Sequence, residues 1–235
     1  MIAAALKGAT KRFGDTLALD GIDLAVEAGE TVALLGPNGA GKTTALSLLL
    51  GLRRPDSGRA EIFGVDPRGA GARVAVGVTP QEAGFPPTLR VREIVDLVRA
   101  HFPSPAPTDE LLDRFELAGV ARRQAGGLSG GERRRLAVAL AFAGEPAALF
   151  LDEPTAGLDV ESRRAVWAEI DRYCVDGGTV LLTTHHLEEA ERLATRVVLL
   201  ARGSVVAEGT AAELADRARA SGLEDAVLTL TKAHG

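Results

Sequence analysis

The sequence predicts an α/β fold: a core with a mostly parallel sheet, an antiparallel β subdomain at the N-terminus and a helical subdomain. Two observations carry this prediction. Between residues 148 and 200, short apolar runs alternate with segments of helical period, which is typical of parallel strands joined by crossover helices. Residues 1–30 instead alternate apolar and polar side chains, as at 22–26, which predicts antiparallel strands with glycine-containing turns.

The remaining elements follow from apolar runs and from helical periodicity. Strands are expected at residues 31–35, 59–63, 74–78, 148–151, 179–183 and 197–200. Helices are expected at residues 44–51, 131–144, 161–173 and 187–193, and between 91 and 120 with a break at the proline-rich 102–107. We therefore expect one domain, with a core at 1–80 and 145–210, a helical lobe at about 82–144 and a short tail at 211–235.

Composition narrows the class of protein. Of the 235 residues 46% are hydrophobic and only 4% aromatic, so the core is aliphatic. The net charge of −5 argues against a general nucleic-acid binder. Cys174 is the only cysteine, which excludes a disulfide within the chain and fits a reducing compartment. The N-terminus predicts no secretory signal, and the apolar runs are far shorter than the ~20 residues of a membrane span.

Residues 36–44 match the pattern Gly-x-x-x-x-Gly-Lys-Thr between a predicted strand and a predicted helix. The glycines let backbone N–H groups surround an anion, and the helix adds the positive end of its dipole. Lys42 would reach the β- and γ-phosphates, and the Thr43 hydroxyl would ligate magnesium. An ordinary glycine-rich turn is the alternative, but the chain's only asparagine and one of its four lysines lie here. We call this segment the phosphate loop: Gly36, Pro37, Asn38, Gly39, Ala40, Gly41, Lys42, Thr43 and Thr44.

Two carboxylates end the apolar run at residues 149–153. Asp152, at a strand end beside a phosphate loop, can hold magnesium directly or through water. Glu153 can then polarise a water for attack on the γ-phosphate. Acids at strand ends are common, so this pair gains its meaning from the phosphate loop upstream.

The segment Leu-Ser-Gly-Gly-Glu at residues 128–132 precedes a predicted helix. Ser129 is a favourable N-cap and forms a capping box pattern with Glu132. The segment is therefore either a capped helix start or a second anion site formed by hydroxyl, backbone N–H groups and helix dipole. The arginines at 133–135 that follow are either a solvated helix face or a docking surface.

In their order along the chain these motifs resemble the ATP-binding subunit of ATP-binding-cassette (ABC) transporters. The resemblance covers nearly the whole sequence and adds Gln81, a Gly-Leu-Asp motif ending at Asp159, and a histidine after a strand at His185. It implies the cassette ATPase fold and ATP and Mg²⁺ as cofactors. It also implies a second cassette subunit, for which we favour a homodimer, and a separate membrane-spanning permease.

The resemblance also implies roles for individual residues. Ser129, Gly130 and Gly131 would contact the γ-phosphate of an ATP held by the other subunit of a head-to-tail dimer, and Asp159 would run across that interface. Gln81 would touch magnesium and the attacking water. His185 would contact the γ-phosphate and orient Glu153, although the neighbouring His186 leaves this choice open from spacing alone. Phe13 would stack on adenine, unless it is a core aromatic.

Two residues depart from the family's pattern. Glu132 replaces the more usual glutamine, and Phe13 replaces the usual tyrosine. Neither change affects the groups that face phosphate or the aromatic face. The apolar residues at 85–89 lie where the family docks its membrane subunit, and covering the core is their alternative role.

The segment at 62–67 and the tail at 223–231 resemble the drug-resistance and polysaccharide-export branch, so we expect export from the inner face of the cell membrane. Alternatives are an importer cassette, a cassette ATPase acting on nucleic acid or the ribosome, and a regulatory module that holds ATP without turnover. The acidic balance and the single phosphate loop disfavour the second, and Glu153 with His185 disfavours the third.

Overall fold

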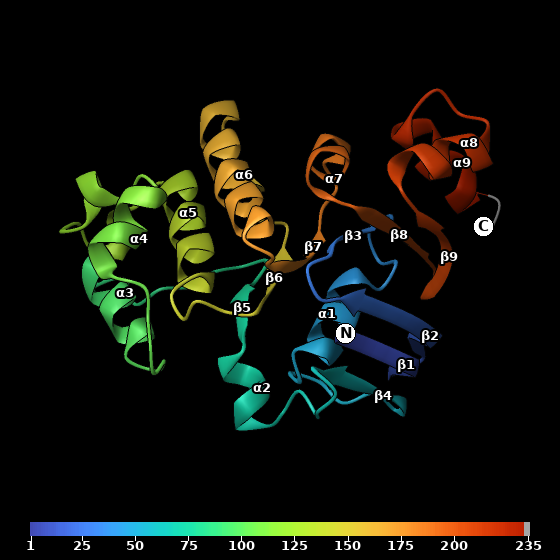
Figure 1. Cartoon of the computed structure of the whole chain (residues 1–235), viewed down its shortest axis with the longest axis horizontal. Helices are drawn as coiled ribbons and strands as arrows, with labels where there is room; N and C mark the ends of the chain where they lie inside the picture. The colour runs from blue at the N-terminus through green and yellow to red at the C-terminus, as the bar shows by residue number, and fades with distance from the viewer. Residues whose placement is uncertain (233–235) are drawn as a thin grey trace. The chain divides into compact units, whose positions relative to one another are not determined.

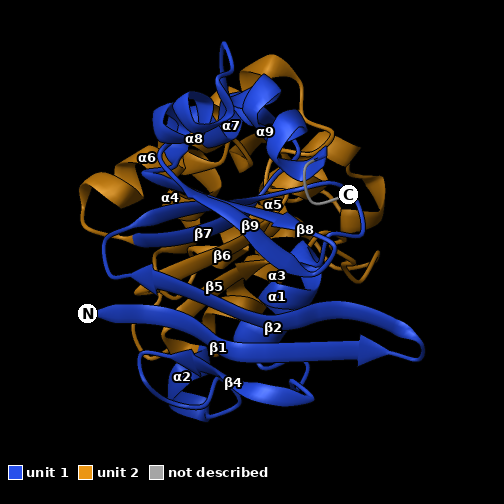
Figure 2. Cartoon of the chain, turned by 90° about the vertical axis from the view of Figure 1, so that its right-hand side faces the viewer, with its two compact units in different colours: residues 1–73, 179–235 blue, residues 74–178 orange. Residues whose placement is uncertain are grey.

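The computed structural model describes residues 1–232, which group into two compact units (Figure 2). Unit 1 consists of residues 1–73 together with the segment from Thr179 onward, and unit 2 consists of Val74–Gly178. The phosphate loop belongs to unit 1, whereas the strand ending in Asp152 and the segment at 128–132 belong to unit 2.

The N-terminal part of unit 1 is an antiparallel sheet with the strand order β2-β1-β4. Strand β1 (Ile2–Phe13) pairs with both β2 (Thr16–Glu27) and β4 (Ser57–Ile62). Within this sheet, side chains such as Leu6 and Leu24 are buried as direct cross-strand partners. The antiparallel prediction for the first 30 residues is therefore confirmed.

The second sheet portion of unit 1 has the order β7-β3-β8-β9. Strand β3 (Thr31–Leu35) lies between β7 (Thr179–Thr183) and β8 (Arg196–Ala201) and pairs with both in parallel. All residues of β3 and β7 are buried, as expected for parallel strands covered on both faces. Strand β9 (Ser204–Gly209) pairs antiparallel with β8 and was not anticipated from the sequence.

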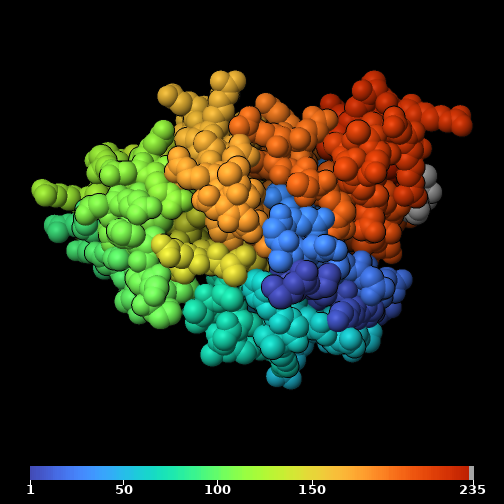
Figure 3. Space-filling view, viewed as in Figure 1, coloured from blue at the N-terminus to red at the C-terminus, as the bar shows by residue number. Residues whose placement is uncertain are grey.

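The longer helices of unit 1 pack against its strands (Figure 1). Helix α1 (Lys42–Leu49) follows the phosphate loop, α2 (Ala70–Val74) lies at the end of the first segment, and α7 (Leu187–Leu193) follows β7. The expected tail contains α8 (Ala211–Ala218) and α9 (Leu223–Lys232). Helix α9 packs its apolar side chains against α8, β8 and β9. The two helices therefore lie together, as the red atoms of the space-filling view show (Figure 3).

Unit 2 contains the parallel strands β5 (Val76–Thr79) and β6 (Ala148–Asp152), four α-helices and two short 3-10 helices. The α-helices are α3 (Val91–Arg99), α4 (Thr108–Arg114), α5 (Gly130–Ala141) and α6 (Val160–Val175). Helix α5 lies so close to β5 that a Cβ at Gly77 would come within 1.9 Å of the Ala141 carbonyl oxygen. Unit 2 thus combines the predicted helical lobe with two predicted core strands and α6.

None of the helices within residues 1–232 is both long enough and apolar enough to cross a bilayer.

Candidate nucleotide site

The phosphate loop has the backbone of an anion cradle. Gly36, Gly39 and Gly41 adopt positive φ angles of 147°, 80° and 108°, a region that residues with a Cβ rarely occupy. A Cβ at Gly36 would lie 2.1 Å from the carbonyl oxygen of Leu200, and one at Gly41 would lie 2.6 Å from that of Ala18. Glycine is therefore required at both positions by conformation and by close approach of neighbouring backbone.

Lys42 is folded over the loop it follows. Its Nζ donates hydrogen bonds to the carbonyl oxygens of Gly36 at 2.7 Å and Pro37 at 3.1 Å, and the side chain is only 8% exposed. The ammonium group thus lies inside the curve of the loop, where bound phosphate oxygens would meet it. Helix α1 begins beyond Gly41, which supplies no side-chain cap that would compete with an anion for the first N–H groups.

Neighbouring segments of unit 1 hold the loop in place. The turn between β8 and β9 donates from the Gly203 N–H to the Ala40 carbonyl, and the Gly203 carbonyl accepts from the Asp20 N–H of β2. The β1–β2 hairpin is thereby tied to the phosphate loop. The same hairpin carries Phe13, which is 39% exposed and therefore not a buried core residue. The guanidinium carbon of Arg53 lies 4.8 Å from the centre of the Phe13 ring.

His185 is separated from the end of β7 by one residue, Thr184, and is exposed. Its ring contacts that of His186, with 4.1 Å between the ring centres. The Thr184 hydroxyl accepts a hydrogen bond from the His186 backbone N–H and shapes this turn. The geometry keeps both histidines at the strand end, so the choice of His185 stays a prediction based on its place in the motif.

In unit 2, one side chain connects the loops that carry Gln81, Asp152 and Glu153. Arg134 of α5 is 7% exposed and donates to the carbonyl oxygens of both Asp152 and Glu153. It also donates to the carbonyl oxygen of Gln81 at 3.0 Å. The interpretation of residues 133–135 as a solvated helix face is therefore wrong for Arg134.

Sequence reasoning missed this arginine because three consecutive arginines on a helix point in different directions. The available signal was helical periodicity. Arg134 shares a face with the apolar residues Val138 and Ala141, four and seven positions later, which are buried. Arg133, one position earlier, is exposed.

Helix α5 begins with the capping box expected from the sequence. The Ser129 hydroxyl accepts from the Glu132 N–H at 3.1 Å, and a Glu132 carboxylate oxygen accepts from the Ser129 N–H at 2.8 Å. Arg123 donates to both oxygens of Glu132. The hydrogen bond from the Ser129 N–H, together with Arg123, lowers the pKa of Glu132 below its ordinary value. Glutamate thus serves the cap as glutamine would. Ser129 and Gly130 are exposed, and Gly131 is partly buried.

Asp159 caps helix α6. One of its carboxylate oxygens accepts from the Ser162 N–H at 2.8 Å, and the other accepts from the Ser162 hydroxyl at 3.2 Å. Arg135 of α5 donates to that same hydroxyl. The Ser162 backbone hydrogen bond is the main cause that lowers the pKa of Asp159. Asp159 is thereby linked through Ser162 to the helix that begins at Ser129.

The protein's own oxygen ligands are too few to bind magnesium without a nucleotide. Among residues 1–232, no group of three His, Cys, Asp or Glu side chains could hold a metal ion by itself. Thr43 is exposed at the first turn of α1, and Asp152 ends β6. Each is an oxygen donor of the kind that Mg²⁺ takes beside waters and phosphate oxygens.

Comparison with known proteins decides the family. The family model for the ABC transporter matches residues 19–156. This chain belongs to the ABC transporter family. It is 46% identical, over 90% of its length, to the daunorubicin resistance ATP-binding protein DrrA3 of Streptomyces coeruleorubidus and covers 69% of that protein. It is 43% identical, over 85% of its length, to the Nod factor export ATP-binding protein I of Burkholderia lata and covers 68% of it.

Solved structures agree with the family. The structure of an ATP-binding subunit of an ABC transporter superposes with a TM-score of 0.89 at 26% identity, covering 97% of this chain and 99% of that one. A dimeric ATP-binding cassette in a post-hydrolysis state, bound to ADP and Pi, gives a TM-score of 0.81 at 27% identity and covers 88% and 98%. The predicted family, cassette fold and transporter ATPase function are confirmed.

Proposed function

We propose that this ABC cassette binds and hydrolyses ATP as a head-to-tail dimer and thereby drives export through a separate membrane-spanning subunit. The observation that carries the proposal is the phosphate loop with Lys42 folded into it. The names of the relatives, which concern daunorubicin resistance and Nod factor export, support export over import for this chain.

The phosphates of ATP would bind to the backbone N–H groups of the phosphate loop, and Lys42 would exchange its two carbonyl partners for β- and γ-phosphate oxygens. Phe13 would stack on the adenine ring. Mg²⁺, held by Thr43 and by Asp152 directly or through water, supplies charge neutralisation on the phosphates when bound. These contacts orient the γ-phosphate for in-line attack.

Hydrolysis would then depend on three polar side chains. Glu153 polarises the attacking water and takes up its proton, while Gln81 and His185 hold the water and the γ-phosphate in line. The products are ADP and phosphate. Glu153 has a left-handed backbone with φ of 51°, an uncommon conformation for a residue with a Cβ. The carbonyl of Glu153 accepts a hydrogen bond from Arg134, which helps to hold this backbone conformation.

The second half of each site would come from the other subunit. Ser129, Gly130 and Gly131 are accessible at the start of α5, where a γ-phosphate could accept their hydroxyl and N–H groups. Asp159 would lie at the same interface. An isologous, two-fold arrangement of two copies would then enclose two ATP molecules. A homodimer is the simplest form, since each copy carries both halves.

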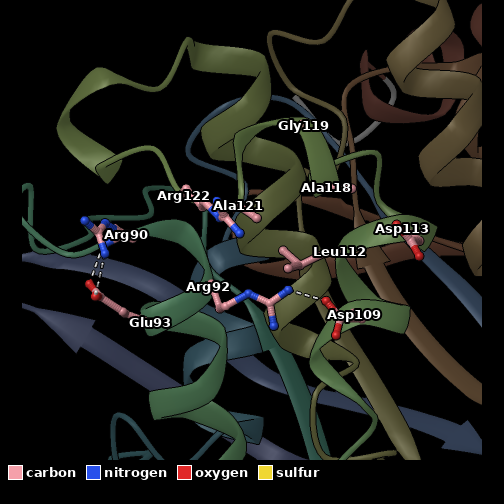
Figure 4. Close-up of a pocket in the computed structure, with 10 residues that line it drawn as sticks. All are labelled: Arg90, Arg92, Glu93, Asp109, Leu112, Asp113, Ala118, Gly119, Ala121 and Arg122. Carbon is pink, nitrogen blue, oxygen red and sulfur yellow. Dashed lines mark hydrogen bonds and ion pairs between the residues drawn. The ribbon is translucent and has the colours of Figure 1, made fainter.

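The membrane subunit would dock on unit 2 beside the loop at 82–90. Pro86 and Pro87 are exposed there, and Phe85 is only partly buried, which disfavours a purely core-covering role. Arg90 also lines a cleft of about 610 Å³. Inside this cleft Arg92 forms an ion pair with Asp109, and Arg90 forms one with Glu93 (Figure 4). A cytoplasmic segment that carries both signs of charge would suit this surface.

The docking loop is also connected to the start of α5. The carbonyl oxygen of Pro87 accepts from the Gly126 N–H at 3.0 Å, and that of Leu89 accepts from the Ala125 N–H at 2.8 Å. Both donors lie shortly before Ser129. Movement of the membrane subunit could therefore reach the γ-phosphate contacts through the backbone, and the cassette would work on the inner face of the membrane.

Glu153→Gln tests the hydrolytic role, because glutamine keeps the shape of the side chain and loses the base. We expect ATP binding at near wild-type affinity and turnover reduced by about a hundredfold or more. We also expect a dimer in size-exclusion chromatography with ATP and Mg²⁺. Glu145→Gln is a matched control, because this glutamate also has a positive φ and is not part of the proposed site. Wild-type turnover in Glu153→Gln, or only monomer with ATP and Mg²⁺, would contradict the proposal.

A further inference from the structure

Arg134 is a buried side chain of unit 2, and all of its guanidinium N–H donors have hydrogen-bond acceptors. A guanidinium has five N–H donors, and Arg134 uses them on five backbone carbonyl oxygens. Its Nη1 donates to Pro80 at 2.8 Å and Gln81 at 3.0 Å, and its Nε donates to Pro154 at 3.1 Å. Its Nη2 donates to Asp152 and Glu153.

The five acceptors come from two segments of the chain. Pro80 and Gln81 follow β5, and residues 152–154 end β6. Both strands end at the same edge of unit 2, since they pair in parallel from Val76–Ala148 to Thr79–Leu151. Beyond that edge, the two loops are no longer held by the sheet, and the guanidinium connects them.

We propose that Arg134 is a positioning residue for ATP hydrolysis, which holds the backbones of Gln81 and Glu153 in a fixed relation. The inference rests on the proposed function, in which those two side chains position and activate the attacking water. Arg134 does not touch substrate in this scheme; it acts through carbonyl groups directly attached to the Cα atoms of the residues that do.

Two features fit this positioning role. Glu153 has a left-handed φ of 51°, and its carbonyl is one of the five acceptors, so Arg134 holds the peptide group that follows this uncommon conformation. Arg134 also lies on α5, five residues after Ser129, so the helix that would contact one ATP molecule carries the side chain that arranges the hydrolytic residues of its own chain. Helix α5 thus begins at the proposed γ-phosphate contact, Ser129, and carries the side chain that holds the backbone of Glu153.

Lysine cannot replace this guanidinium, because its ammonium has three donors and no planar fork. Arg134→Lys, in the full chain with ATP and Mg²⁺, is therefore expected to lower kcat by about a hundredfold, the effect of a misplacement near 1 Å. The dissociation constant for ATP should stay within about twofold of wild type, because Lys42 and the phosphate loop are in unit 1. Arg134→Ala should behave alike and should regain part of its kcat when guanidinium ion, but not ammonium, is added.

Arg133→Lys is the matched control, since Arg133 is exposed and makes one long hydrogen bond of 3.5 Å to the Leu128 carbonyl. It should keep wild-type kcat. Thermal unfolding of each variant shows whether turnover is being compared between folded proteins. If Arg134→Ala does not fold, the kcat of folded Arg134→Lys still decides the matter.

The proposal is overturned if folded Arg134→Lys keeps kcat within about threefold of wild type, or if the loss lies in ATP affinity instead of kcat. Glu153→Gln separates this result from failure of the proposed function. Wild-type turnover in Glu153→Gln refutes the hydrolytic assignment itself. An inactive Glu153→Gln beside an active Arg134→Lys refutes only the positioning role.

Discussion

Helices α1 and α5 both begin after glycine-rich segments, but their first turns are built differently. Helix α1 starts from Gly41 in a left-handed conformation with no side-chain cap, and a lysine lies inside the loop. Helix α5 starts from Ser129 with a reciprocal capping box. The first arrangement keeps N–H groups and a charge for an anion, whereas the second already satisfies two of its N–H groups with its own side chains.

This difference implies an order of events. An anion should bind first and most tightly at the phosphate loop, where the cradle and the ammonium are preformed. At α5, the Ser129 hydroxyl accepts from Glu132, and its proton remains available for a phosphate oxygen. That contact would form with a nucleotide that is already bound at the phosphate loop of the other subunit. The site at α5 should therefore govern turnover and dimerisation more than affinity.

Lys42→Ala should give the largest effect on the α1 side. A charge-assisted hydrogen bond contributes about 1.5–3 kcal/mol, so ATP affinity should fall about tenfold to a hundredfold or more. Equilibrium binding of a fluorescent ATP analogue measures this. Lys7→Ala is the control, since Lys7 is exposed and its ammonium forms an ion pair with Glu61, away from the phosphate loop. If Lys42→Ala bound ATP as tightly as wild type, the assignment of residues 36–44 as a phosphate loop would be wrong.

Ser129→Ala tests the α5 side and should leave the ATP affinity of the single chain near wild type. It should reduce turnover, and Ser129→Arg should abolish it by blocking the approach of a second subunit. Loss of the cap should also cost about 1 kcal/mol in the free energy of unfolding. Thr210→Ala is a matched control, because Thr210 forms the same capping box with Glu213 at α8.

The two capping variants separate stability from function. Thr210→Ala should lose a similar free energy of unfolding in a urea titration and keep its ATPase rate. If Ser129→Ala also keeps its rate per folded molecule, and Ser129→Arg is active, the contact with a second subunit is refuted. A fall in the rate of Thr210→Ala would show that turnover follows stability alone.

The sequence predicted those parts of the molecule that depend on local pattern. The strands at β3, β7 and β8 followed from short apolar runs, and the Ser129–Glu132 capping box from a spacing of three residues. These features need only periodicity or a neighbour along the chain. The placement of Asp152 and Glu153 at the end of β6 was predictable for the same reason.

Other features depend on tertiary neighbours and were missed. The acceptors of Arg134 lie up to 54 residues away, so helical periodicity can place Arg134 on the buried face of α5 but cannot identify the carbonyl groups that it binds. Strand β9 contains a short Val-Val pair after a turn, too little for a period to emerge, and it forms because β8 offers an edge. The roles of Gln81, His185 and Asp159 concern contacts with a nucleotide and a second subunit, so they stay predictions.

Glu132→Gln should change the free energy of unfolding least among these variants, and it tests the capping box of α5 directly. Glutamine keeps the box but is neutral, so the variant loses the charge of the bond to the Ser129 N–H and the charge interaction with Arg123, the latter about 0.2–1 kcal/mol for a surface pair. Since the folded-state pKa of Glu132 is lowered, its charge stabilises the fold above the ordinary pKa of about 4.3. That contribution disappears as the pH falls through the folded-state pKa, so wild type and variant should converge in acid.

Free energies of unfolding from urea titrations at pH 7 and at a pH below the folded-state pKa of Glu132 measure this convergence. Glu213→Gln is the control, because the pKa of Glu213 is lowered by Thr210, with no arginine among the causes. Glu213→Gln should therefore lose less stability at pH 7 than Glu132→Gln. Turnover in Glu132→Gln should remain near wild type, since the groups expected to face phosphate are unchanged. A large loss of turnover would place the Glu132 carboxylate in the nucleotide site, and the two helix starts would then differ in their ligand contacts as well as in their caps.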